Sequence, residues 1–133
     1  MGLDNGITLK IKDREKFGEI PDWLTHESWE PADEYEIHYW RKCWNVRGEI
    51  LNYFHVDMEG GDDYSMGLSD LVGINELLKP LYSRSGWDES LSIWAWKDIK
   101  SSLTNRLKYA EKVAKWLKDK PIGSYQLYFY DSY

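Results

Sequence analysis

Arg47 is the residue whose position is hardest to explain by packing alone. On a helix of about 100° per residue, it falls within an apolar stripe. That stripe consists of Trp40, Cys43, Trp44, Ile50, Leu51 and Phe54. A guanidinium buried there without an acidic partner is strongly destabilising. Three interpretations stay open: the side chain snorkels past the edge of the stripe, forms a buried ion pair, or binds a ligand.

Acidic residues follow this predicted helix in a glycine-containing loop: Asp57, Glu59, Asp62 and Asp63. Carboxylates at such spacing can chelate a hard cation, although they do not match the EF-hand frame. They are also potential partners for Arg41, Lys42 or Arg47. We interpret the loop as a solvated acidic segment and keep cation binding as the alternative. For Arg47, we expect the partner to be Asp4 or the pair Asp62 and Asp63.

The histidines show no metal-ligand spacing. His55 follows the predicted helix 40–55, where a histidine interacts favourably with the helix dipole. Its alternative role is a general base paired with Asp57 or Asp63. Cys43, on the apolar stripe, is expected to be a buried thiol. The sequence contains no phosphate-binding glycine loop, nucleophile elbow, zinc motif or dinucleotide fingerprint, so no cofactor is expected.

Composition sets the class of protein. A chain of 133 residues with 42% hydrophobic and 30% charged residues is typical of one globular domain, here 1–133. No segment is long and apolar enough for a membrane span, and the N-terminus lacks the apolar core of a signal peptide. With one cysteine, a reducing cytoplasm is the expected location. The net charge of −6 makes nucleic acid an unlikely partner.

Aromatic residues are abundant, with eight tryptophans and ten tyrosines. They bury much area per residue, so one interpretation is a small core filled with large side chains. The other is a surface rich in tyrosine and tryptophan that binds a partner or a flat ligand. The two interpretations are compatible.

Periodicity predicts an α+β domain, with a small antiparallel sheet that includes the N- and C-terminal strands and about three helices. Serine 69 or 65 is the expected cap of the second helix and Pro80 its end. The expected elements are a strand at 6–12, a long loop at 13–34 with a helical turn in "PDWLTHESW", an extended "EYEIHY", a helix at 40–55, a loop at 57–67, a helix at 69–79, an ambiguous segment at 81–95, a helix at 96–118 and a strand at 124–133.

Four segments of the chain, "MGLDNGI", "YWRKCWNVRGEI", "GGDDY" and "YFYDSY", resemble a family of small proteins encoded by tailed bacteriophages and prophages. The most specific match is the Tyr-Trp-Arg-Lys sequence at 39–42. Many members carry a histidine where this chain has Arg47, which puts any catalysis by that histidine in doubt here. The family has no assigned activity, so the resemblance implies a phage or prophage setting. Its matching positions would gather Asp4, Trp40, Arg41, Arg47, Asp62 and Asp63.

We therefore predict a non-enzymatic binding protein, acting on a host protein or small ligand in the bacterial cytoplasm, with a role against host defence or in host takeover. The predicted binding residues are Asp4, Tyr39, Trp40, Arg41, Arg47, His55, Asp62 and Asp63. The alternative is a metal-assisted hydrolase of a phosphorylated or nucleotide-like substrate. In it, Arg41, Lys42 and Arg47 would hold the anion and Asp62 and Asp63 the metal. A virion component is a third interpretation.

Overall fold

The computed structural model describes residues 4–24, 32–41, 44–55, 63–83 and 96–132. Within these residues, four antiparallel strands form one sheet in the order β2–β1–β4–β3. The strands are β1 (Asp4–Ile11), β2 (Glu34–Arg41), β3 (Asp63–Met66) and β4 (Tyr125–Ser132). The helices are α1 (Arg14–Phe17), α2 (Trp44–Phe54), α3 (Leu68–Ser83) and α4 (Trp96–Leu117). The predicted α+β class is confirmed.

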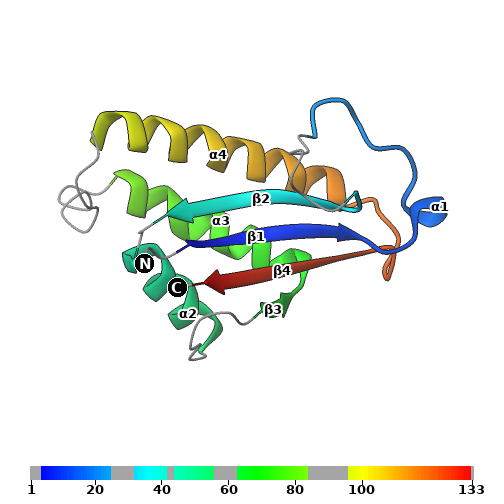
Figure 1. The fold of residues 1–133 in the computed structure, drawn as a ribbon, viewed down its shortest axis with the longest axis horizontal. Coiled ribbons are helices and arrows are strands. Elements are labelled where there is room, and N and C mark those ends of the chain that lie inside the picture. The colour runs from blue at the N-terminus through cyan, green and yellow to red at the C-terminus, as the bar shows by residue number, and fades with distance from the viewer. Residues whose placement is uncertain (1–3, 25–31, 42–43, 56–62, 84–95, 133) are drawn as a thin grey trace.

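The N- and C-terminal strands both belong to the sheet, as the sequence predicts, and the structure pairs them at its centre. Their register runs from Asp4 opposite Ser132 to Ile11 opposite Tyr125. Asn5, Ile7 and Leu9 of β1 face the core, and Gly6 and Thr8 between them are buried as well on the other face of the sheet. The pairing ties both ends of the described chain into the sheet (Figure 1).

One face of the sheet is covered by α3 and α4, which lie behind it in the view of Figure 1. The core between these layers is built from the inward positions of the strands and one face of each helix. Its fully or nearly fully buried members include Ile7, Leu9, Leu127 and Phe129 from the sheet, Leu71, Ile74 and Leu78 from α3, and Leu107, Ala110, Val113 and Leu117 from α4. The other face of the sheet has no helix on it in the described part of the chain.

The predicted helix at 40–55 begins too early. Trp40 and Arg41 belong to β2, which continues the predicted extended segment 34–39, and the helix starts at Trp44. The tryptophans at 40 and 44 fit a helical stripe, but residues 34–41 also fit a strand rich in aromatic and branched residues. Pairing with β1 decides between the two, because it satisfies the backbone of 34–41 and buries Trp40 to 1% exposure.

Four further predictions need correction. The predicted loop 57–67 contains β3, and the predicted loop 13–34 contains the short helix α1, capped by Asp13. Helix α3 starts at Leu68, where the Asp70 carboxylate accepts from the Gly67 N–H at 2.9 Å, so neither Ser69 nor Ser65 is the cap. Pro80 lies inside α3 rather than ending it. Proline lacks the N–H that would donate to the preceding turn. Pro80 lies close to the C-terminal end of α3, so one hydrogen bond near that end is lost.

Helix α4 agrees with the predicted helix at 96–118, and β4 agrees with the predicted strand at 124–133. The turn predicted in "PDWLTHESW" is present at its start, where Leu24 N–H donates to the Pro21 carbonyl at 3.1 Å. Its remainder, 25–29, lies outside the described residues, as do 57–62 and 84–95. None of the helices in the described ranges combines the length and the apolar character that a membrane crossing requires.

Candidate functional site

Several residues predicted as a site lie at one end of the sheet, where β1 begins and β2 and β4 end. Asp4 is the register partner of Arg41, and Trp40 is the register partner of Asn5. Asp63 begins β3 opposite Tyr130, also at this end. Asp4, Trp40 and Arg41 thus lie together through the β1–β2 register, whereas Asp63 lies on β3 at the opposite edge of the sheet and Arg47 lies on α2. Asp62 and Lys42 lie outside the described residues.

A carboxylate that meets Arg47 is Asp131, which was not among the partners expected from the sequence, Asp4, Asp62 and Asp63. Arg47 Nε donates to Asp131 Oδ2 at 2.7 Å, and the two side chains are 14% and 0% exposed. A buried ion pair is thus the observed arrangement of the three considered. The sequence did carry a signal for Asp131, because it continues the inward alternation of Leu127 and Phe129 and is a charge at an apolar position.

Asn5 adds to this polar end of the inward face. It is fully buried beside Asp131 in the register, at a position that continues the alternation of Ile7 and Leu9. Among the described residues, neither Asn5 amide atom has a hydrogen-bond partner, nor does Asp131 Oδ1. Buried polar atoms without partners are destabilising. The burial of Asn5 and Asp131 in this part of the core therefore lowers the free energy of unfolding.

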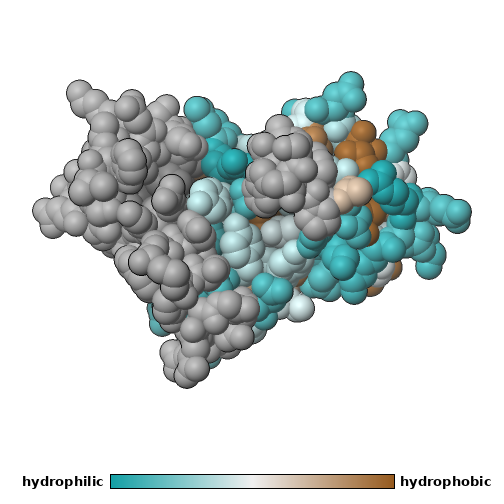
Figure 2. Space-filling view, in the orientation of Figure 1, coloured by the Kyte–Doolittle hydropathy of each residue, from teal (hydrophilic) through white to brown (hydrophobic). Residues whose placement is uncertain are grey.

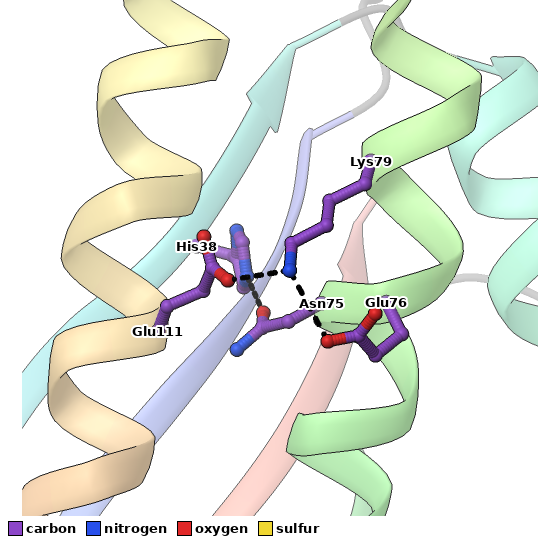
Figure 3. Close-up of polar contacts among 5 residues, drawn as sticks. All are labelled: His38, Asn75, Glu76, Lys79 and Glu111. Atoms are coloured by element: carbon purple, nitrogen blue, oxygen red, sulfur yellow. Dashed lines mark hydrogen bonds and ion pairs between the residues drawn. The ribbon is translucent and has the colours of Figure 1, made fainter.

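His38 is a second buried polar residue that the sequence analysis did not select. Its Nε2 lies 2.8 Å from Oδ1 of Asn75 on α3 (Figure 3). Its ring stacks on Trp40, with the two centroids 4.9 Å apart. Burial lowers the His38 pKa to about 4, and the charge of Arg106 acts in the same direction. Nδ1 has no partner, so the neutral ring donates through Nε2 and keeps an unused acceptor.

Lys79 ties α3 to α4 beside this pair (Figure 3). Its Nζ lies 3.0 Å from Glu111 Oε2 on α4 and 3.2 Å from Glu76 Oε1 on its own helix. These hydrogen bonds, the one to Glu111 first, raise the Lys79 pKa. His38 is neutral, fully buried and joined to Asn75 behind this bridge. A general base must reach the proton that it abstracts. Because His38 is fully buried, we interpret its bond to Asn75 as structural.

The open face of the sheet carries two tyrosines that cross from β4 over β1 to glutamates on β2. Tyr130 Oη donates to Glu36 Oε2 at 2.8 Å, and the Tyr130 ring lies over Gly6 on the intervening strand. Tyr128 Oη donates in the same way to Glu34 Oε1. Burial, followed by the bond to Glu34, raises the Tyr128 pKa. Both rings are therefore held by their hydroxyl ends.

Tyr39, Asp63, Ser65 and Lys10 complete this open face, and all four are exposed. Tyr39 is 36% exposed, opposite Gly6. Figure 2 shows the face in the orientation of Figure 1, with described residues that are mostly pale to teal over the middle of the sheet. We call the set Lys10, Glu34, Glu36, Tyr39, Asp63, Tyr128 and Tyr130 the tyrosine–glutamate face.

Two other places were considered as sites. A cavity of about 330 Å³ lies at the opposite end of the sheet, lined by Lys12, Met66, Gly67, Leu68, Ile122, Gly123, Tyr125, Gln126 and Leu127. It contains no acid or histidine. His55, predicted as a site residue, is exposed after the end of α2 with φ 58°. In the described residues, no group of three or more histidine, cysteine or acidic side chains is placed to hold a metal ion.

Comparison with known proteins gives no match. A scan against protein-family models, a search of curated proteins and a search of solved structures each found nothing similar to this chain.

Proposed function

We propose that this chain is a non-enzymatic binding protein that docks a protein partner on its tyrosine–glutamate face. The observation that carries the proposal is the pair of tyrosines fixed across β1, Tyr128 to Glu34 and Tyr130 to Glu36. Interfaces obtain much of their affinity from aromatic side chains with little conformational freedom left to lose. Tyrosines already held by their hydroxyls meet that requirement.

The exposed side chains of Lys10, Tyr39 and Asp63 on this face favour a macromolecule over a small ligand. Small molecules bind in concave sites that enclose most of their surface, and the cavity found among the described residues lies at the other end of the sheet. The buried polar residues, including His38 and Asp131, are almost inaccessible. From the resemblance to phage and prophage proteins, we propose a host protein as the partner and the bacterial cytoplasm as the setting.

Site-specific photocrosslinking tests this proposal. A benzoylphenylalanine placed at Tyr39 on the open face is expected to capture a discrete host protein in bacterial cells. The matched control is the same probe at Val72, which is comparably exposed, at 39% against 36%, on the outer side of α3. Capture through position 39 alone supports the proposal. Capture through both positions equally, or through neither, would rule out the open face as the docking surface.

A further inference from the structure

Ile122 is the most exposed large apolar side chain in the part of the chain that the structure describes. It is fully exposed, whereas the others in this class, Tyr39, Tyr53 and Val72, are between 36% and 39% exposed. Turns generally carry glycine, proline or small polar residues at their tips. A single exposed apolar residue is common on protein surfaces; what distinguishes Ile122 is the surface beside it.

The turn that carries Ile122 is fixed by hydrogen bonds. It connects α4 to β4 and lies at the end of the sheet near α1 (Figure 1). The Ser124 N–H and the Ser124 hydroxyl both donate to the Pro121 carbonyl, at 3.2 and 2.6 Å. Gly123 has φ 87°, a conformation that glycine adopts without strain. The turn therefore holds Ile122 in place in solvent and has little backbone freedom to lose on binding.

An apolar cavity of about 330 Å³ lies directly beside Ile122, which forms part of its wall. Its other apolar walls are Met66 and Leu68, at the junction of β3 and α3, and Tyr125 and Leu127 of β4. Pockets that bind small ligands have volumes of roughly 300–1,000 Å³, so this cavity has room for the four-carbon side chain of an isoleucine. A projecting apolar residue and an apolar recess thus lie next to each other on one surface.

We infer that a second copy of this chain docks here, with Ile122 of each copy inserted into the cavity of the other. Because Ile122 borders its own cavity, a two-fold axis beside it brings each isoleucine to the recess of the other copy. Both complementary parts of such a contact are present on one chain. Burial of apolar surface supplies its affinity. This inference goes beyond the binding function proposed above and does not rest on it.

The charges around the cavity permit this contact, although the whole chain has a net charge of −6. Lys12 is the one charged residue in the described wall of the cavity. The N–H groups of Lys12 and Asp13 donate to the Ser124 carbonyl, so both residues lie against the turn. The charged residues just before the turn are Lys118, Asp119 and Lys120. Because cations and acids are mixed at this end, two copies can meet here without opposing rows of like charge.

A small molecule fits this surface less well than a second copy does. Small ligands bind where the protein encloses most of their surface, whereas Ile122 in the cavity wall is fully exposed to solvent. A contact limited to this end of the molecule is small, and interfaces that bury less than roughly 1,000 Å² are weak or transient. We therefore expect a dimer that forms reversibly at high protein concentration.

The amide signals of the ¹⁵N-labelled chain, recorded between about 20 µM and about 1 mM, test for this weak association. We expect the signals of Gly67, Gly123 and Tyr125 to shift with concentration and those of α2 to stay unchanged. Sedimentation equilibrium over the same range should show a monomer in equilibrium with a dimer. Signals and a mass that do not depend on concentration would overturn the inference.

A matched pair of variants locates the contact. Ile122→Ser should weaken self-association at least about tenfold, because each copy loses the side chain that fills the other's cavity. Position 122 is fully exposed, so the variant should fold like the parent chain. Tyr39→Ser removes an exposed apolar side chain from β2, away from the cavity, and should change self-association less than about twofold. Equal effects of the two variants would place the contact elsewhere and refute the inference.

Intermolecular NOEs identify the occupant. In a sample of equal parts ¹³C-labelled and unlabelled chain, we expect NOEs from the Ile122 methyl groups of one copy to the Leu68 and Leu127 methyl groups of the other. NOEs that join other surfaces would contradict the proposed contact. If the chain stays monomeric while Ile122→Ser abolishes capture of a host protein, the cavity takes a different protein and the second copy is ruled out. Capture through position 39 tests the binding function separately and does not depend on these results.

Discussion

Arg47 on α2 and Asp131 on β4 are 84 positions apart in the sequence and 2.7 Å apart in space, where they form an ion pair. The Asp131 side chain is fully buried, and that of Arg47 is 14% exposed. The ion pair connects α2 to the C-terminal end of β4. Its contribution to the free energy of unfolding depends on the cost of leaving either charge buried without the other.

Arg47→Met is expected to lower the free energy of unfolding by about 3 kcal/mol, because it leaves the Asp131 carboxylate buried without its cation. Urea denaturation at neutral pH measures this change. Adding Asp131→Leu to Arg47→Met should recover most of the loss, since the buried charge is then gone.

The control for this prediction is Lys79→Met, which removes an exposed cation that bridges Glu76 and Glu111. Its effect should stay below about 1 kcal/mol, as for other exposed pairs. If Arg47→Met is as mild as Lys79→Met, the Arg47–Asp131 pair makes no special contribution to stability.

His38 makes stability depend on pH. The unfolded chain protonates this histidine below its ordinary pKa of 6.5, whereas the folded chain resists protonation down to about 4. The contribution is therefore fully present above pH 6.5, is lost as the pH falls, and is exhausted below about 4. Each pH unit in this window removes up to about 1.4 kcal/mol, or about 3 kcal/mol in all.

Unfolding measured at intervals between pH 7.5 and 4 checks this expectation. His38→Gln should remove about 3 kcal/mol of the pH-dependent loss, while His55→Gln, at an exposed position, should leave it in place. An NMR titration of the folded protein in which His38 titrates near 6.5 would contradict the prediction directly.

Replacement by alanine is expected to change stability in opposite directions at Gly6 and at Gly48. At Gly6 a Cβ would overlap the His38 carbonyl and crowd the Tyr130 ring, so Gly6→Ala should destabilise by about 2 kcal/mol or more. At Gly48, inside α2, the added Cβ would meet no described atom within 4 Å apart from its chain neighbours and the backbone of its own helix. Gly48→Ala should therefore stabilise by about 0.5–1 kcal/mol through helix propensity alone. Thermal unfolding of both variants tests the two signs together.

The Tyr130–Glu36 bond is expected to contribute about 1 kcal/mol to stability. A double-mutant cycle with Tyr130→Phe and Glu36→Gln measures the coupling between the two side chains. Additive losses would show that the phenol and the carboxylate do not act on each other, and the tyrosine would then not be fixed by this bond.

The sequence by itself determined the elements whose patterns are long and regular. Helix α4 was predicted from the recurrence of residues such as Leu107, Ala110, Ala114 and Leu117, and β1 and β4 from strict alternation. These patterns are local, because each element must turn one apolar side toward the core whatever it packs against. The pairing of the two terminal strands followed from the same alternation.

Only the tertiary structure decided between strand and helix at residues 40–41, because the aromatic spacing fitted both and pairing with β1 made the difference. It also decided that Arg47 meets Asp131, and that Tyr128 and Tyr130 reach Glu34 and Glu36 across β1. Such contacts depend on strand register between segments far apart in the chain. A local pattern carries no information about which residues of two distant strands lie opposite each other. These pairs of residues could therefore be identified only from the structure of the sheet.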